Sequence, residues 1–177
     1  DHPVHPNGFA RYWVHNGFLT VNGEKMSKSL GNFITVEDLL SRGVKGEVIR
    51  WALLSARYNE PLDWTEKLLA DAQKIVDRLY RKRPDRLQDA NARPDAGVLS
   101  ALCDNLNTPQ ALALLQELEG DALLATAQYL GILHRTAAQW FQGDAETDTA
   151  WIEAQIVARQ QAKAQRDFAA ADAIRER

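Results

Sequence analysis

The chain has 177 residues, of which 45% are hydrophobic and 25% charged, a composition typical of folded globular proteins that excludes a wholly disordered chain. No stretch approaches the roughly 20 consecutive apolar residues that span a bilayer, and the single Cys103 permits no internal disulfide. We therefore expect a cytoplasmic protein without a membrane segment. The net charge of −3 is unusual for a nucleic-acid binder.

The first 35 residues indicate the end of an α/β unit. Residues 18–21 alternate as a strand does, and Asn22-Gly23 is a strong turn pair. A single strand cannot form a sheet, so we expect its partners in residues before Asp1 or on another chain. His15, at the start of the strand, is interpreted as a structural, hydrogen-bonded histidine.

From Thr35 onward the pattern is helical. Thr35–Asp38 resembles a capping box that opens a short helix, which ends by Gly43. Residues 47–54 predict a second helix that is apolar over most of its circumference and therefore buried, with Trp51 in the core. A long amphipathic helix follows Asp63-Trp-Thr-Glu66 and stops at Pro84.

A linker over residues 84–97, rich in Pro, Gly, Asp and Asn, separates these helices from a second group. Helices are predicted over 98–105, from Pro109 with Thr108 as a candidate cap, over 123–133, and over 151–177 as one helix or two. An antiparallel bundle is the economical arrangement for helices joined in this way. Cys103 is expected to be a buried residue of that bundle.

The loop Lys25-Met-Ser-Lys-Ser29, continued by Leu30-Gly-Asn32, carries the most specific signal in the chain. Lysine is a compact charge on a flexible stem, suited to contact phosphate oxygens, and hydroxyl groups add hydrogen bonds to the same anion. Two lysines three residues apart are usually part of a solvated turn. The full string is much rarer and favours nucleotide chemistry.

That string resembles the nucleotide-binding loop of class I aminoacyl-tRNA synthetases. Its surroundings are similar to the cysteinyl-tRNA synthetase family in Tyr12–Leu19, Val21–Lys25 and Asn32–Val36, and later in Cys103–Ala111 and Arg166–Arg175. The resemblance implies a mainly α fold, in which the tail of a Rossmann-type α/β catalytic domain precedes stem-contact helices and an antiparallel helical bundle. The implied divisions are 1–35 for the end of the catalytic domain, 36–83 for stem-contact helices, 84–97 for the linker and 98–177 for a tRNA-binding bundle.

The resemblance also implies an activity and a site. The family activates cysteine with ATP and Mg, forming cysteinyl-adenylate, and transfers cysteine to tRNA(Cys). Lys25 and Lys28 would be catalytic, because cations that follow the charge on the leaving pyrophosphate stabilise the transition state. Met26, Ser27 and Ser29 would complete the ATP-binding loop, with Met26 as an apolar anchor.

A basic segment runs from Lys74 to Pro94, with seven basic residues against three acidic ones, a net charge of +4. Contact with the tRNA backbone and a solvated helix end explain it equally well. The candidate tRNA-binding residues are Lys74, Arg78, Arg81 and Lys82.

No metal ligand is assigned within the chain. The family uses a zinc ion for the substrate thiolate, but its ligands belong to segments before the region matched here. His2 and His5 have no second ligand pair nearby and are interpreted as part of a solvated loop. The missing N-terminal catalytic half is therefore an expected partner, and the fragment alone is expected to be inactive.

Two alternatives remain open at this point. One is a related cysteine ligase of mycothiol synthesis, which passes cysteine to an amino sugar. The other is a non-catalytic helical RNA-binding or interaction module that retains the loop as a relic. The segments 103–111 and 166–175, similar to the family's helical region, favour the synthetase.

Overall fold

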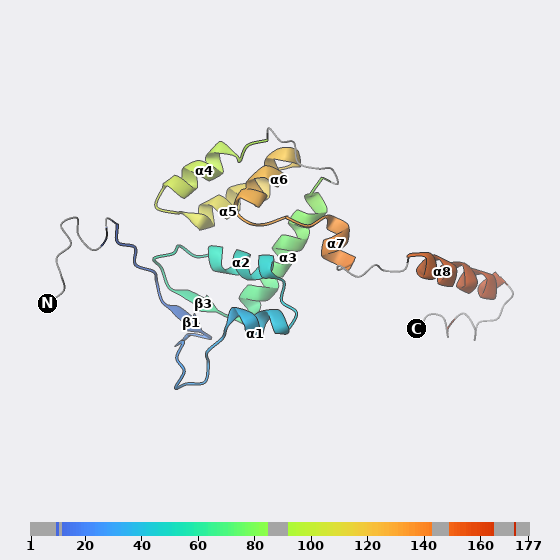
Figure 1. The fold of residues 1–177 in the computed structure, drawn as a ribbon, viewed down its shortest axis with the longest axis horizontal. Helices are drawn as coiled ribbons and strands as arrows, with labels where there is room; N and C mark the ends of the chain where they lie inside the picture. The colour runs from blue at the N-terminus through green and yellow to red at the C-terminus, as the bar shows by residue number, and fades with distance from the viewer. Residues whose placement is uncertain (1–9, 11, 85–91, 143–148, 165–171, 173–177) are drawn as a thin grey trace. The chain divides into compact units, whose positions relative to one another are not determined.

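The computed structural model describes residues 10, 12–84, 92–142, 149–164 and 172 (Figure 1). Within them the chain is mainly α, as predicted, with eight helices and three short strands. It divides into two compact units, residues 1–137 and 138–177. None of the helices in the described part is long and apolar enough to cross a membrane.

A three-stranded sheet in the order β2-β1-β3 forms the first part of unit one. β1 (Leu19–Val21) and β2 (Glu24–Lys25) are antiparallel and joined by Asn22 and Gly23, whose φ angles of 52° and 81° are those of a tight hairpin turn. β1 also pairs in parallel with β3 (Leu62–Trp64). The expectation that the strand's partners lie outside the chain was therefore wrong, because the helices between β1 and β3 return the chain to the sheet.

Six helices complete unit one. Thr35 and Asp38 form the predicted capping box, and Thr65 caps the long helix by accepting a hydrogen bond from the Leu68 N–H. The long helix ends at Lys82, two residues before Pro84, as its sequence predicts. The helices are α1 (Val36–Ser41), α2 (Gly46–Leu54), α3 (Glu66–Lys82), α4 (Ala96–Cys103), α5 (Thr108–Glu117) and α6 (Gly120–Tyr129).

The core of unit one lies along α2 and α3 and continues between α4 and α5. Trp51 is buried, as predicted, at 3% exposure. The second helix is not buried all round, however, since Leu53 remains 48% exposed. The other buried core side chains of α2 and α3 are Val48, Ile49, Ala52, Leu69, Ala72, Val76, Leu79 and Tyr80.

Three expectations for the second helical group need correction. Asn107, not Thr108, caps α5, and the Thr108 hydroxyl instead donates to the Ala56 carbonyl at 3.1 Å. Cys103 is exposed, because it is the last residue of α4, whose buried residues are Val98 and Ala101. The helix predicted over 123–133 is α6, which begins at Gly120 and ends at Tyr129. His15, which precedes this group and was interpreted as a structural, hydrogen-bonded histidine, is exposed.

Unit two contains α7 (Ala137–Gln142), apart from its first residue, and α8 (Thr149–Ala164). Trp140 is buried. The side chain of Trp151 and most of the predicted helix beyond Ala164 lie outside the described residues, as does the segment 166–171 of the family resemblance.

Candidate nucleotide-binding site

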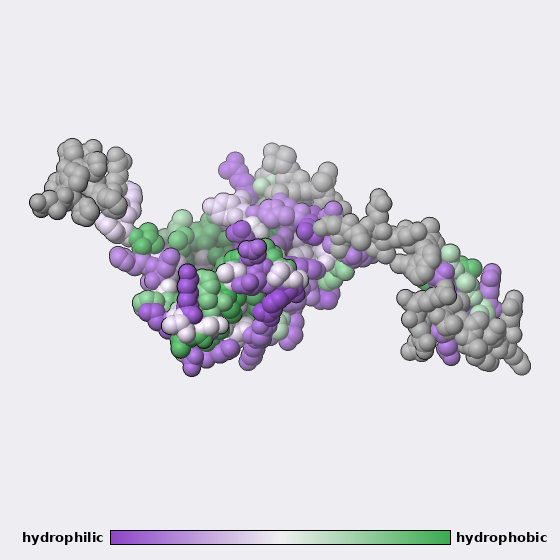
Figure 2. All heavy atoms as spheres, turned by 60° about the horizontal axis from the view of Figure 1, so that its bottom comes forward, coloured by the Kyte–Doolittle hydropathy of each residue, from purple (hydrophilic) through white to green (hydrophobic). Residues whose placement is uncertain are grey.

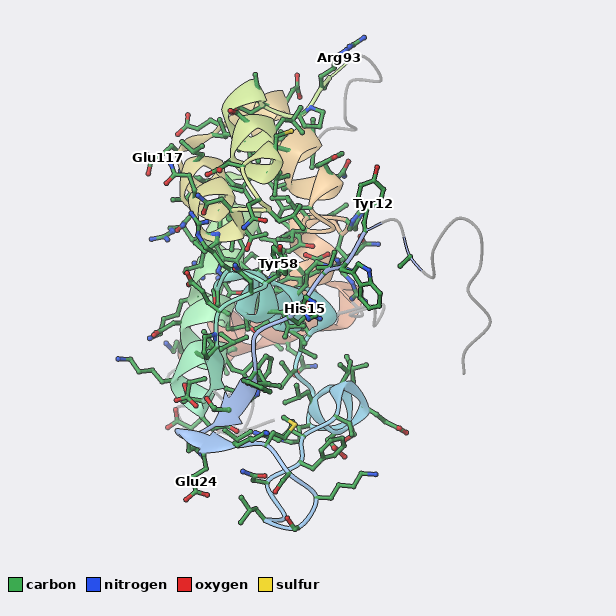
Figure 3. The ribbon with its side chains drawn as sticks, turned by 90° about the vertical axis from the view of Figure 1, so that its left-hand side faces the viewer. Tyr12, His15, Glu24, Tyr58, Arg93 and Glu117 are labelled. Atoms are coloured by element: carbon green, nitrogen blue, oxygen red, sulfur yellow. The ribbon has the colours of Figure 1, made fainter. Side chains whose placement is uncertain are left out.

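The two-lysine loop connects β2 to α1 and is closed by the side chain of Asn32. The Ser27 N–H donates to Asn32 Oδ1 at 2.9 Å, and Asn32 Nδ2 donates to the Lys25 carbonyl at 3.3 Å. Gly31 supplies a left-handed turn with φ of +67°. Figure 3 shows the loop at its lower end, beyond the labelled Glu24. Asn32 belongs to the loop sequence that resembles the family, but the two hydrogen bonds by which its side chain closes the loop were not predicted.

The two serine hydroxyl groups of the loop lie together. Ser27 Oγ and Ser29 Oγ are 3.2 Å apart, within hydrogen-bonding distance, and Ser27 Oγ also accepts from the Leu30 N–H at 3.3 Å. Ser29 is exposed and Ser27 is half-buried. Two neighbouring hydroxyls on one loop can therefore bind a single anion together.

Each lysine of the loop lies against an aromatic ring that sequence reasoning did not single out. Lys25 Nζ is 4.8 Å from the centroid of the Phe18 ring, and Lys28 Nζ is 5.9 Å from that of Phe33. Among the described residues, neither ammonium group is within salt-bridge distance of a carboxylate. Exposed contacts of this kind are worth about 0.5–1 kcal/mol. A phosphate group can therefore displace either ring from its lysine.

Met26 fixes the base of the loop. Its N–H donates to the Leu19 carbonyl at 3.3 Å, and its side chain lines a small apolar cavity of about 60 Å³. Leu39 and Trp64, which are buried, line the same cavity. The apolar contact holds one side of the loop to the protein and leaves the hydroxyl and ammonium groups at the surface.

Asp63 on β3 clamps the hairpin that leads into the loop. Its Oδ1 accepts from the Gly23 N–H and from the Thr20 hydroxyl, both at 2.8 Å. The Gly23 N–H, and then the Thr20 hydroxyl, holds the pKa of the Asp63 carboxyl below its usual range. No local pattern in the sequence indicates this role, because Asp63 lies about 40 residues from the hairpin.

We expect the hairpin to weaken in acid because of Asp63. A carboxyl whose pKa is lower in the folded state stabilises that state above its unfolded pKa of about 4. The contribution is lost as the pH falls through the lower folded pKa. Urea unfolding between about pH 5 and pH 2 should show this loss, and Asp63→Asn should flatten the acid side of the profile.

The matched control is Glu24→Gln, which changes an exposed carboxylate of the same hairpin and should keep the wild-type pH profile. An Asp63→Asn profile identical to that of the wild type would remove Asp63 from this role.

The basic stripe is formed by Lys74, Arg78, Arg81 and Lys82, all exposed on α3. Arg78, Arg81 and Lys82 follow Lys74 by four, seven and eight residues, and this spacing places all four on one face of the helix. Arg78 Nη2 donates to Gln116 Oε1 at 2.7 Å, and Lys82 Nζ donates to the Gln116 carbonyl at 3.0 Å. Since Gln116 is neutral, these contacts orient two cations without offsetting their charge.

No group of three or more His, Cys, Asp or Glu side chains within the described ranges is placed to hold a metal ion. His2 and His5 lie outside those ranges. The donor set needed for zinc is therefore not found in the described part of this chain.

Residues 2–74 match the family model described as the tRNA synthetases class I (C) catalytic domain. The chain is also similar to three bacterial proteins named cysteine–tRNA ligase. It is 45% identical to that of Hyphomonas neptunium, 43% to that of Rhodospirillum rubrum and 40% to that of Ehrlichia ruminantium, over 97% of this chain in each case. The chain spans only 41 or 42% of the length of these relatives.

Proposed function

The chain belongs to the cysteinyl-tRNA synthetase family, and we propose that it supplies the ATP-binding loop and the tRNA-contacting helices of a cysteine–tRNA ligase. The observation that carries the proposal is the loop itself, in which two exposed lysines and two neighbouring hydroxyls lie on one clasped turn. The longer protein would act in the cytoplasm on cysteine, ATP and tRNA(Cys).

In the proposed reaction the cysteine carboxylate attacks the α-phosphorus of ATP, and pyrophosphate leaves as cysteinyl-adenylate forms. Lys25 and Lys28 leave their aromatic rings and follow the negative charge that grows on the β- and γ-phosphates. Ser27 and Ser29 donate hydrogen bonds to the same oxygens. The terminal ribose of the tRNA then attacks the acyl carbon, and AMP leaves. A magnesium ion bound to ATP would offset part of the phosphate charge.

We propose that the segments of the chain have the roles that the family resemblance implies. Residues 1–35 form the end of a Rossmann-type catalytic domain, 36–83 contact the tRNA stem, 84–97 link, and 98–177 belong to an antiparallel tRNA-binding bundle. The zinc of the longer protein is held by residues outside this chain. The remaining catalytic half is needed for activity, so the isolated chain activates no cysteine.

The test uses the full-length protein that contains this chain. Cysteine-dependent exchange of pyrophosphate into ATP is expected. Its absence would favour the alternative in which the protein is a non-catalytic RNA-binding or interaction module. Charging of tRNA(Cys) is also expected. Exchange without charging, but with transfer of cysteine to an amino sugar, would replace the synthetase with the ligase of mycothiol synthesis.

The basic stripe on α3 leads to a separate prediction about tRNA binding. In the full-length protein, Lys74→Ala combined with Lys82→Ala should raise the KM for tRNA and leave pyrophosphate exchange unchanged. Each lost phosphate contact should reduce the slope of log affinity against log salt by about one. The control is Lys74→Arg combined with Lys82→Arg, which keeps both charges and should keep the salt slope of the wild-type protein. An unchanged salt slope in the double variant would mean that the stripe faces solvent and does not contact the tRNA backbone.

A further inference from the structure

A hollow of about 340 Å³ lies where the end of α2 meets the turn between α4 and α5 and the end of α6. Its volume falls within the range of about 300–1,000 Å³ that small-ligand pockets occupy. The lining is mainly apolar, with one arginine and two tyrosines, and it includes Arg50, Leu54, Tyr58, Leu106, Tyr129 and Leu130. We refer to this hollow as the α2–α6 pocket.

Apolar exposure alone would not distinguish the α2–α6 pocket. Val36 and Leu40 of α1 are also exposed, and Figure 2 shows hydrophobic side chains gathered among hydrophilic ones on the face that it views. Three other features occur together at the pocket: an arginine without a carboxylate partner, a largely exposed tyrosine, and a turn with an unfavourable backbone conformation.

Arg50 is the cation of the pocket, and the chain that follows α6 fixes its position. Gly131 has a φ of +77°, and a Cβ atom at this residue would lie 2.9 Å from Arg50 Cζ. The guanidinium group therefore packs directly on a backbone where only glycine leaves room. Among the described residues, no carboxylate lies within salt-bridge distance of Arg50, which is exposed. Its charge is therefore available to an anion.

The two tyrosines offer a stacking surface and a hydrogen-bonding group. Tyr129 is the last residue of α6 and is 61% exposed although it lines the pocket. An aromatic ring exposed in this way can stack on a planar group. The hydroxyl of Tyr58, a residue labelled in Figure 3, donates to Asn105 Oδ1 at 3.0 Å. Its oxygen can still accept a hydrogen bond from a ligand.

The turn between α4 and α5 holds a leucine in a conformation that leucine rarely adopts. Asn105 and Leu106 have φ angles of 49° and 51°. Asparagine tolerates this left-handed region, whereas glycine would suit it better than leucine does. Leu106 is 52% exposed, so burial in the core does not account for it either. Residues held in unfavourable conformations cluster at binding sites. We therefore attribute Leu106 to the pocket that it lines.

We propose that the α2–α6 pocket binds one unpaired nucleotide of the tRNA, an assignment that rests on the proposed function. The base stacks on Tyr129 and contacts Leu106, and the phosphodiester pairs with Arg50. Among the described residues that line the pocket, only Arg50 is charged. A single cation suits a phosphodiester, which carries one negative charge, better than a free nucleoside triphosphate, which carries several. Unpaired RNA bases are commonly bound by stacking on aromatic side chains.

The first test measures the affinity of the full-length protein for a tRNA(Cys) transcript over a range of salt concentrations. Tyr129→Ala should raise the Kd about tenfold and keep the salt slope, because stacking releases no counterions. Arg50→Gln should reduce the slope of log affinity against log salt by about one. Wild-type affinity in Tyr129→Ala would overturn the proposal, as would an unchanged salt slope in Arg50→Gln.

Three control variants separate the pocket from general effects of substitution. Tyr129→Phe keeps the ring and should keep the wild-type Kd within about twofold. Arg50→Lys keeps the charge and should keep the salt slope. Arg42→Gln changes an exposed arginine outside the pocket, whose charge Glu66 offsets at 2.7 Å, and should change neither Kd nor slope. A loss of affinity in Tyr129→Phe equal to that in Tyr129→Ala would contradict stacking.

A second test identifies the occupant of the pocket. A photo-crosslinking phenylalanine analogue at position 129 of the full-length protein should form crosslinks to an unpaired nucleotide of tRNA(Cys). Crosslinks only to paired nucleotides, to a second copy or to the same polypeptide would overturn the proposal, as would crosslinks to free AMP that tRNA does not displace.

Cysteine-dependent pyrophosphate exchange is measured separately, because adenylate formation precedes transfer to tRNA in the proposed reaction. Tyr129→Ala should leave this exchange unchanged. If the wild-type protein lacks exchange but forms the crosslink to an unpaired nucleotide, the proposed function fails and the pocket assignment stands. If it exchanges pyrophosphate and binds tRNA without that crosslink, only the pocket assignment is overturned.

Discussion

Replacing Lys28 with alanine in the full-length protein is expected to lower kcat for cysteinyl-adenylate formation by about 10²–10³-fold. The KM for cysteine should change little, because the ammonium group acts on the leaving pyrophosphate rather than on the amino acid. Interactions that strengthen only as charge develops reduce kcat and kcat/KM together when they are removed. Cysteine-dependent pyrophosphate exchange under steady-state conditions measures both constants.

Two further variants separate the charge of Lys28 from its surroundings. Phe33→Leu removes the ring 5.9 Å from Lys28 Nζ and should change kcat by less than about fivefold, because the contact is weak. Lys28→Arg keeps the charge but spreads it over a planar group, so it should restore only part of the rate. If Lys28→Ala shows wild-type exchange kinetics, Lys28 has no part in the mechanism.

The features that sequence predicted well are local. The capping box of Thr35 and Asp38, the turn at Asn22-Gly23 and the stop before Pro84 each depend on a few neighbouring residues. The loop was recognised because its whole string is rare. Its inner contacts are also local, since Asn32 reaches back only five and seven residues. Their pattern nevertheless requires a folded turn and was not predicted.

The features that sequence missed depend on distant contacts. β3 pairs with β1 across about 43 residues, and no alternation in Leu62–Trp64 indicates its partner. The exposure of Cys103 and Leu53 could not be predicted for the same reason, because burial depends on which other elements cover a helix. Leu53 shows this most clearly, since the composition of α2 predicts burial that the described residues do not provide.

Glu47 is another such residue, and its sequence position at the start of α2 suggests only an exposed helix-end acid. In the structure its Oε2 accepts from the Tyr80 hydroxyl at 2.9 Å and from the Leu133 N–H at 3.0 Å. Its Oε1 accepts from the His134 N–H at 3.3 Å. The Tyr80 hydroxyl in turn accepts from the Arg135 N–H at 3.3 Å. One carboxylate thus joins α2, α3 and the segment after α6.

The protonation of Tyr80 supports this network. Burial, and then the negative charge of Glu47, raises the pKa of the Tyr80 hydroxyl well above its ordinary value, although the Arg135 N–H acts in the opposite direction. The hydroxyl therefore remains a donor to Glu47 throughout the pH range in which proteins are usually studied. Tyr80 is fully buried, so this donor has no access to water if Glu47 is removed.

Glu47→Ala is accordingly expected to lower the free energy of unfolding by about 2–4 kcal/mol, because it leaves a buried hydroxyl and two backbone N–H groups without their acceptor. Chemical denaturation monitored by tryptophan fluorescence measures the loss. Tyr80→Phe should cost about 1–2 kcal/mol, since the Glu47 carboxylate keeps its backbone donors. The combined variant should cost less than the sum of the two, because both remove the same hydrogen bond.

The matched control is Glu37→Ala, which removes an exposed acid from the first turn of the neighbouring helix α1. It should change stability by less than about 0.5 kcal/mol. If Glu47→Ala is no more destabilising than Glu37→Ala, the carboxylate network does not hold the segment after α6. The position of that segment would then depend on Ile132 and Leu133, which are fully buried and would have to fix it by apolar packing alone.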